Sequence, residues 1–441
     1  MFSRKDLIKL IIPLVIEQML NVSVGLADSL MVSRAGEAAV SGVSIVDSIN
    51  VLLMGLFGAL ATGGAVVSAQ LLGQKDEKEA SKAGEQLIAV ILGLSTVMMI
   101  LAVIFGRYLL AALFGDVEAE VMLNAKTYFF FSALSFPFIA LYNACTALFR
   151  SMGNSRVSMQ ISLLVSSLHI VLNLVLIFGL DLGVAGAALS TLISRVLSAV
   201  SMFILLRNKN LPIHIGSIRN FRFNVILIKR ILRIGVPNGL ENSVFQMGKI
   251  LVQGITAGLG TSAITANAIA VTIGSMGLLP GSAMNLALIT VIGRCMGARD
   301  YEGVKRYTFK LMKFTYIVMA AWNFIILLLI PIILRLYHLT EGTSHITTQL
   351  LIYHCILASL IWPLSFTLPN ALRATNDVKY TMWISMLSMW IWRIGFSYVL
   401  AIVFDMGLLG IWIAMTIDWL FRSICFVSRF LKEKYKSLSA F

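Results

Sequence analysis

Apolar stretches separated by short polar segments run along the whole chain. Each stretch extends over about 20 residues, which as a helix crosses a hydrocarbon core of about 30 Å, and Gly, Pro or clustered charges separate it from the next. Runs such as 90–104 and 325–334 do not alternate between apolar and polar, so the pattern favours helices over the strands of a membrane barrel. It predicts twelve spans, near residues 10–33, 45–72, 87–113, 124–148, 157–180, 184–206, 231–257, 269–295, 311–336, 346–371, 381–404 and 408–430.

The composition supports a lipid environment. Of the 441 residues, 58% are hydrophobic and 13% are charged, whereas roughly a quarter of the residues of a soluble domain are charged. The four cysteines lie far apart without metal-ligand spacing, so the sequence indicates neither a zinc site nor a disulfide framework. The apolar stretch after the charged start contains polar residues, and we interpret it as a retained first span. We therefore expect an all-α integral membrane protein.

The basic residues are distributed unevenly between the two ends of the spans. With a cytoplasmic N-terminus, 28 of the 35 Lys and Arg residues fall on cytoplasmic segments or the adjoining helix ends, and 4 fall outside. The positive-inside rule then places both termini in the cytoplasm, as in a multi-pass protein of the cell membrane. A basic face against anionic lipid heads explains the net charge of +14 without a nucleic-acid partner.

The second half of the chain repeats the first at an offset of 224 residues, or 223 in one place. The matches are Pro13 and Glu17 with Pro237 and Glu241, Gly36 with Gly260, Gly73 and Asp76 with Gly297 and Asp300, Arg150 with Arg373, and Asp181 with Asp405. Because each copy has an even number of spans, we predict two six-helix lobes related by pseudo-two-fold symmetry along the membrane normal, with a cavity between them. The predicted parts are an N-lobe at 1–206, a linker at 207–230, a C-lobe at 231–441, and short surface helices at 74–86 and 298–310.

An acidic stripe marks the first span. Glu17 and Asp28 lie at membrane depth, where an ionised acid costs about 2.5–3.5 kcal/mol on insertion scales. Their spacing of eleven residues, about three helical turns, places them on one face, which also holds Asn21. Burial raises the pKa of a carboxyl group and a nearby cation lowers it, so an acid in such a place can exchange a proton as its access to water changes. Asp28 is our first candidate for ion coupling, while Glu17, about one turn past Pro13, also fits a structural role.

Two polar residues of the fifth span are candidates for the same site. His169 and Asn173 are four residues apart on one helix face, and His changes its charge near neutral pH. The alternative for His169 is a purely structural hydrogen bond between helices. Oxygen ligands from Asp28, Asn21 and Asn173 could instead bind Na⁺, which as a hard cation prefers oxygen. Both H⁺ and Na⁺ stay open as the coupling ion, and no other metal or cofactor is expected.

The seventh span is the most polar one of the second half. The residues predicted to line a substrate cavity there are Glu241, Gln246, Lys249 and Gln253. Lys249 is expected either to face the cavity or to neutralise an acid on another helix. For the other intramembrane charges we favour structural roles: Arg195 and Arg393 as partners of Asp418 or of helix ends, and Asp47 as a residue near a helix start.

Several motifs together resemble the multidrug and toxic compound extrusion (MATE) transporters. They are Ile12-Pro13-Leu14-Val15-Ile16-Glu17-Gln18, Ala27-Asp28-Ser29-Leu30-Met31, Ala69-Gln70-Leu71-Leu72-Gly73, Leu148-Phe149-Arg150-Ser151-Met152-Gly153-Asn154, and Gly183-Val184-Ala185-Gly186-Ala187-Ala188. The resemblance spans essentially the whole chain. It implies an antiporter that exports organic, often cationic and aromatic, compounds in exchange for H⁺ or Na⁺, and it implies that Asp28 is the principal coupling residue.

The chain departs from this family in two places. Many relatives have Asn and then Asp four residues apart in the fifth helix, where this chain has His169 and Asn173, so one acid is missing. Some relatives carry acids deeper in the seventh helix and in the tenth, where this chain has Phe245 and the 362–363 region. These departures leave the coupling ion and its stoichiometry open.

Three functions compete at this point. The first is a cation-coupled antiporter for small organic, amphipathic compounds. The second is a flippase for a lipid-linked or anionic substrate, which Lys249, Arg195 and Arg393 would favour if they face one cavity. The third, an intramembrane enzyme, lacks any nucleophile with a nearby base or paired His ligands. We expect a transporter that is not an enzyme, acts as a monomer, and has membrane lipids and a small organic substrate as its only partners.

Overall fold

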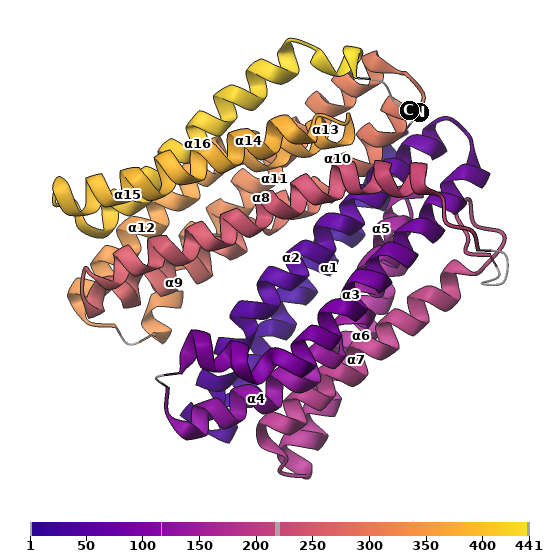
Figure 1. Ribbon diagram of the computed structural model, residues 1–441. Coiled ribbons are helices and arrows are strands. Elements are labelled where there is room, and N and C mark those ends of the chain that lie inside the picture. The colour runs from indigo at the N-terminus through magenta and orange to yellow at the C-terminus, as the bar shows by residue number, and fades with distance from the viewer. Residues whose placement is uncertain (1, 116, 217–220, 338, 439–441) are drawn as a thin grey trace. The chain divides into compact units, whose positions relative to one another are not determined.

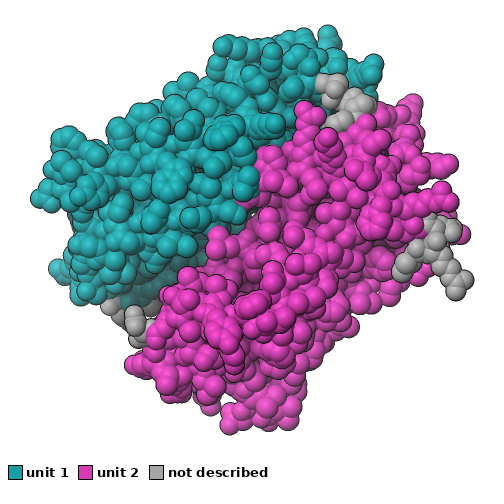
Figure 2. Space-filling view, viewed as in Figure 1, with its two compact units in different colours: residues 1, 240–441 teal, residues 2–239 magenta. Residues whose placement is uncertain are grey.

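The structure is a computed structural model, and it describes residues 2–115, 117–216, 221–337 and 339–438. All regular elements of this described part are helices. The chain forms two compact units, residues 2–239 and residues 240–441 together with residue 1, coloured separately in Figure 2. Residues 217–220, inside the predicted linker, lie outside the described residues, and the lobe boundaries inferred from the sequence stay a prediction.

The unit of residues 2–239 contains seven helices and the first half of an eighth. These are α1 (Arg4–Val32), α2 (Glu37–Gly73), α3 (Glu77–Phe114), α4 (Ala119–Leu134), α5 (Phe136–Ser151), α6 (Ser155–Asn173), α7 (Gly183–Leu206) and the start of α8 (Val225–Ala257). As Figure 1 shows, they run side by side as a bundle; α1 packs along α6, and α2 packs against α3, α4 and α5. A six-residue π-helical segment, Leu174–Gly179, continues α6.

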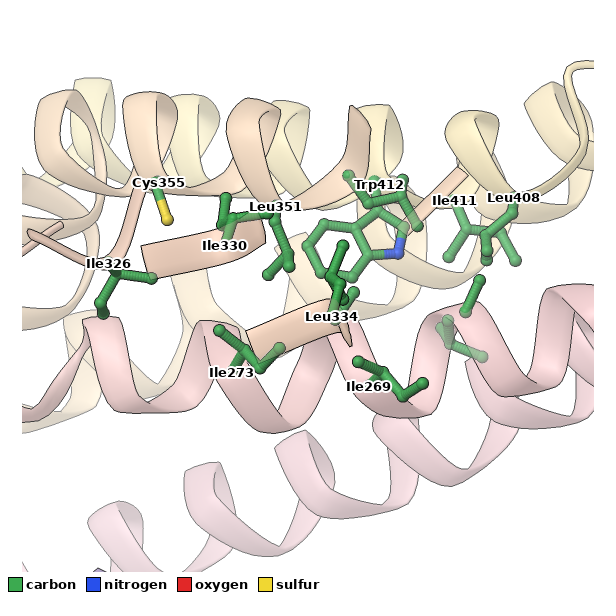
Figure 3. Close-up of a cluster of buried hydrophobic side chains, with 14 of the residues drawn as sticks. Ile269, Ile273, Ile326, Ile330, Leu334, Leu351, Cys355, Leu408, Ile411 and Trp412 are labelled. Carbon is green, nitrogen blue, oxygen red and sulfur yellow. The ribbon is translucent and has the colours of Figure 1, made fainter. Parts of the chain in front are cut away.

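The unit of residues 240–441 repeats this order of elements. It contains the second half of α8 and then α9 (Thr261–Gly277), α10 (Leu279–Gly297), α11 (Tyr301–Leu336), α12 (Glu341–Leu360), α13 (Leu368–Ala374), α14 (Val378–Ser388), α15 (Phe396–Tyr398) and α16 (Gly407–Leu431). Its core is built from aliphatic side chains around Trp412, with Ile269 and Ile273 of α9 and Ile330 of α11 among them (Figure 3). The Trp412 indole also donates to Asn267 Oδ1 at 3.0 Å, which satisfies its one polar atom.

The twelve predicted spans are confirmed. Among the described residues, nine helices are long and apolar enough to cross a membrane, and two bent pairs, α4 with α5 and α12 with α13, raise the number to eleven. The pairs bend by 47° and 56°. The remaining predicted span, 231–257, coincides with the later part of α8, which carries several charged and amide side chains.

The internal repeat extends to unusual backbone conformations. Residues other than glycine with positive φ recur at the repeat offset: Lys75 (62°) with Arg299 (56°), and Asp181 (52°) with Asp405 (53°). Gly36 (102°) and Gly260 (95°) recur in the same way, each immediately before a helix. A left-handed residue forces a tight turn between two helices. Both copies therefore place their tight turns at matching positions.

The separate surface helices predicted at 74–86 and 298–310 are wrong. Asp76 and Asp300 cap helices whose next turns continue without a break into the spans, as α3 and α11. Each Asp carboxylate accepts a backbone N–H three residues later, from Glu79 at 2.9 Å and from Gly303 at 2.8 Å. No Pro or Gly pair interrupts these turns, so the helix begun at the cap propagates into the apolar run. The amphipathic pattern of each segment therefore belongs to the first turns of a long helix, α3 or α11, whose later turns are apolar.

Candidate functional site

A cavity of about 340 Å³ lies within the unit of residues 2–239. Its polar and charged lining comes from α1, α2, α4, α5, α6 and α7: Asn21, Asp28, Ser29, Ser44, Asp47, Tyr128, Tyr142, Ser162, Ser166, His169, Asn173, Thr191, Ser194, Arg195 and Ser198. Apolar residues, among them Val24, Val40 and Met54, complete the wall. The volume falls in the range of pockets that bind small molecules, and the lining mixes apolar with polar groups as such pockets do.

Asp28 is the centre of a hydrogen-bonded group in this cavity. His169 Nε2 lies 2.8 Å from Asp28 Oδ1 and 3.0 Å from Oδ2, and Asn173 Nδ2 donates to Oδ1 at 2.7 Å. The Asp28 side chain is 35% exposed, and that of His169 is 7% exposed. The spacing of four residues on α6 brings both donors to one face, and the packing of α1 on α6 brings that face to Asp28. We call Asp28 and His169 the Asp28–His169 pair.

The far side of the His169 ring contacts two hydroxyl groups of α7. Nδ1 lies 3.1 Å from Ser194 Oγ and 3.1 Å from Ser190 Oγ, and Ser190 also donates to the His169 carbonyl at 3.2 Å. A hydroxyl can donate or accept. Nδ1 can therefore accept a hydrogen bond when the ring is neutral and donate one when the ring is protonated. The surroundings satisfy His169 in both charge states, as a proton-carrying group requires.

Two cavity residues to which the sequence analysis gave structural roles are Asp47 and Arg195. The predicted second span began at residue 45, but α2 begins at Glu37, after the left-handed Gly36, so Asp47 lies about three turns inside the helix. Its closest described hydrogen-bond partner is Asn50 Nδ2 at 3.4 Å. Arg195 of α7 donates to Ser135 Oγ at 2.7 Å. Their charge at membrane depth was the sequence signal that could have identified them.

Glu17 lies outside the cavity lining. It is 2% exposed and accepts hydrogen bonds from Arg150 Nη2 at 2.7 Å and from Ser158 Oγ at 3.0 Å. These contacts join α1 to α5 and α6. They favour the structural alternative for Glu17, and its coupling role stays a prediction.

Glu241 repeats the contact of Glu17 in the second unit. Arg373 Nη2 donates to Glu241 Oε1 at 2.7 Å, and Arg422 Nη2 lies 3.7 Å from the same oxygen. Glu241 stands 224 residues after Glu17, and Arg373 stands 223 residues after Arg150. Both units therefore contain the same buried contact between a glutamate and an arginine. The sequence repeat matched these residues between the two halves but did not show that the glutamate and the arginine touch.

The other residues predicted for the substrate cavity lie on α8 and are not part of the cavity described above. Gln246 is half-buried, and Lys249 and Gln253 are exposed in this unit. Lys249 Nζ lies 4.9 Å from the centre of the Phe245 ring. The role of these residues at a substrate cavity stays a prediction.

The pairing considered for Arg393 is present in the second unit. Arg393 Nη1 lies 3.8 Å from Asp418 Oδ2, and Asp418 Oδ1 accepts a hydrogen bond from Ser388. By the repeat offset of 224, Arg393 corresponds to His169, Asp418 to Ser194, and Val252 to Asp28. Where His169 contacts Ser194 in residues 2–239, the equivalent positions in residues 240–438 thus hold an arginine beside a carboxylate.

Comparison with known proteins identifies what this arrangement is similar to. The family model named MatE matches the chain twice, over residues 13–175 and 237–399, which are themselves 224 residues apart. The uncharacterized transporter YisQ of Bacillus subtilis is 28% identical over 423 residues, which cover 95% of this chain and 92% of that protein. A probable multidrug resistance protein NorM of Thermotoga maritima is 26% identical over 442 residues, covering 98% and 93%.

Solved structures share the fold. A transporter of the MOP superfamily from Pyrococcus furiosus, described as having a binding pocket of reverse polarity, superposes with a TM-score of 0.90 at 22% identity, over 98% of this chain and 96% of that chain. An outward-facing multidrug resistance MATE family transporter superposes with a TM-score of 0.90 at 21% identity, over 98% of this chain and 96% of that chain.

Proposed function

Because this chain belongs to the MatE family of membrane transporters, we propose that it is a secondary active antiporter that exports small organic compounds in exchange for protons. Export is supported by the relatives named as probable multidrug resistance proteins. The proposed substrates are small, amphipathic and often cationic. The protein acts as a monomer in the cell membrane, with both termini in the cytoplasm, and needs no cofactor besides the coupling ion.

The contact between Asp28 and His169 is the observation that carries this proposal. Without its exchangeable proton the pair consists of a carboxylate and a neutral imidazole, and it attracts a cationic substrate. When a proton enters, His169 becomes an imidazolium that neutralises the carboxylate 2.8 Å away, and the attraction for the substrate is lost. Proton and substrate then exclude each other from one site, which is the requirement for antiport.

The donors around Asp28 favour H⁺ over Na⁺. Both carboxylate oxygens lie within hydrogen-bonding distance of His169 Nε2, and Oδ1 also accepts from the Asn173 amide. Na⁺ needs several oxygen ligands directed at it, whereas the described hydrogen-bond contacts of the Asp28 carboxylate come from nitrogen.

Everted membrane vesicles test the proposal. A fluorescent organic cation is added, and its transport is driven separately by a pH gradient and by a gradient of about 100 mM Na⁺. At this ionic strength exposed charges are largely screened beyond about 10 Å, so an effect of Na⁺ on transport indicates specific coupling. We expect transport with the pH gradient and none above background with Na⁺. Transport driven by Na⁺ alone would contradict proton coupling, and transport of no cation under either gradient would contradict export of cations.

His169 variants separate the two charge states of the pair. In the wild type, binding of ethidium to purified protein should be weaker at about pH 6 than at about pH 8, because a protonated imidazole would neutralise the Asp28 carboxylate that attracts the cation. His169→Gln, which stays neutral, should bind ethidium at both values with little change. His169→Lys, which stays charged, should bind ethidium weakly at both. Fluorescence titration measures the two dissociation constants, and a Gln variant with the wild-type pH dependence would contradict the proton-carrying role.

The flippase alternative has less support from the described charges. Of the three cations that suggested it, only Arg195 lines the cavity of residues 2–239, where two carboxylates accompany it. Lys249 and Arg393 belong to the other unit, and Arg393 faces Asp418. A cavity with more acidic than permanently basic groups favours a cationic substrate over the phosphate of a lipid.

A further inference from the structure

A second, smaller pocket lies at the surface of the unit of residues 2–239, between α3 and α4, which pack against each other (Figure 1). Its volume is about 140 Å³. Apolar side chains of both helices line it together with Arg107 of α3 and Lys126 of α4, and none of its described lining residues is acidic. Gly106 allows the close approach of the helices, because a Cβ atom there would lie 2.5 Å from the Phe129 ring. We call this site the α3–α4 pocket.

The two basic residues lie at the same depth. Arg107 is seven residues before the end of α3 at Phe114, and Lys126 is seven residues after the start of α4 at Ala119. Both are therefore about 10 Å from the ends of the two helices. The 20 residues of α3 from Leu87 up to Arg107 carry no charge and span about 30 Å, the thickness of a hydrocarbon core. The pocket thus lies where the headgroups of one leaflet meet the acyl chains.

The two cations have no acidic partner. The described contacts of Arg107 are with its neighbour Tyr108, whose hydroxyl accepts a hydrogen bond and whose ring centre lies 4.5 Å from the guanidinium carbon. Within the described part of the chain, neither Arg107 nor Lys126 forms an ion pair. Two like charges at the edge of a low-dielectric medium attract an anion that can contact both.

Apolar surface adjoins these charges. Val103 and Phe130 line the pocket, and their side chains are 41% and 46% exposed. Ile104 and Leu123 are also exposed on the same two helices, at 55% and 65%. The site therefore combines a cationic end with an apolar surface that can contact a hydrocarbon chain, which is the complement of an anionic amphiphile.

We propose that the α3–α4 pocket binds an anionic phospholipid, whose phosphate contacts Arg107 and Lys126 and whose acyl chains pack along Val103 and Phe130. This site is separate from the Asp28 cavity and does not depend on the function proposed above. The pocket does not suit the exported compounds, because they are proposed to be cations. Its volume of about 140 Å³ is also below the roughly 300–1,000 Å³ of sites that enclose a whole small molecule.

The second unit indicates that the fold itself does not require these cations. By the repeat offset of 224, Arg107 corresponds to Pro331 and Lys126 to Leu350. Neither of the surrounding stretches, 325–334 and 346–353, contains a charged residue. Only 4 basic residues are predicted on this side of the membrane, and two of them line this one pocket. A basic pair that one of two copies carries indicates a ligand of that copy.

Native mass spectrometry of the purified full-length protein in detergent tests the inference. Titration with phosphatidylglycerol and, separately, with the net-neutral phosphatidylcholine gives the dissociation constant of the first bound lipid. The wild type should bind phosphatidylglycerol about thirtyfold more tightly, because each Lys or Arg near an anionic headgroup contributes about 1 kcal/mol. Arg107→Gln combined with Lys126→Gln should bind both lipids equally, whereas Arg107→Lys keeps the charge and should keep the preference.

A matched double variant controls for net charge. Arg34→Gln combined with Arg335→Gln removes the same two charges from the other basic residues predicted on this side, both of them exposed. It should retain the full preference for phosphatidylglycerol. Because Arg107 and Lys126 are also exposed, their double variant should melt with the wild type in detergent without added lipid, so that a change in lipid binding does not reflect unfolding.

Three results would overturn the inference. The first is equal binding of both lipids by the wild type. The second is an unchanged preference after loss of both Arg107 and Lys126. The third is an equal loss of preference in the variant of Arg34 and Arg335, which would assign the effect to net charge and not to the α3–α4 pocket. None of these results bears on export driven by protons, which the vesicle experiment measures separately.

Discussion

Asp28→Asn is expected to lower proton-driven export to about 1% of the wild-type rate or less. Asparagine has nearly the same shape but cannot ionise, so the pair loses the negative charge that holds either a cationic substrate or the imidazolium of His169. The carboxylate is the only group that His169 Nε2 contacts at hydrogen-bonding distance apart from the Asn173 amide, 3.4 Å away, among the described residues. Fluorescent cation transport in everted vesicles, driven by a pH gradient, measures the effect.

A matched variant controls for the loss of an acid as such. Asp181→Asn makes the same substitution at an exposed turn between α6 and α7, where φ is 52°, a conformation that Asn tolerates well. It should transport at the wild-type rate. Full transport by Asp28→Asn, at equal protein levels, would mean that coupling does not pass through this carboxylate.

Glu241→Gln is expected to cause the largest loss of stability, about 3–5 kcal/mol. The carboxylate is buried between Arg373, at 2.7 Å, and Arg422, at 3.7 Å, and both guanidinium groups are at most 10% exposed. Without the glutamate charge, Arg373 loses its partner carboxylate close to the second buried cation, Arg422. Glu17→Gln should cost less, because the described contacts of Glu17 include a single arginine, Arg150, whose side chain is 17% exposed.

Thermal unfolding of the purified protein in detergent, followed by tryptophan fluorescence, compares the two variants. The order of melting temperatures should be wild type, then Glu17→Gln, then Glu241→Gln. Glu120→Gln, at an exposed position of α4, provides the control and should melt with the wild type. If Glu241→Gln melts with the control, the link between α8 and the arginines contributes no net stability.

The sequence predicted part of the site because some of its geometry is local. His169 and Asn173 share a face of one helix by their spacing, and the acid at residue 28 stood out because an ionisable group in lipid is costly. From the sequence, we gave Asp47 and Arg195 structural roles. Whether these residues line the cavity depends on where α2 begins and on how α2 and α7 pack in the bundle. The start of α2 at Glu37 follows from the conformation of Gly36, which no apolar pattern reports.

The sequence by itself determined the class of fold, the twelve helical spans and the duplication of the chain. Backbone groups in lipid must bond within the helix, so the apolar runs predict that the spans are helices, and repeated residues at an offset of 224 predict two copies. Only the tertiary structure decided which charges meet: Asp28 with His169, Glu17 with Arg150, and Glu241 with Arg373. Such contacts join residues 132 to 141 positions apart, and their distances depend on helix packing, which spacing along one helix cannot specify.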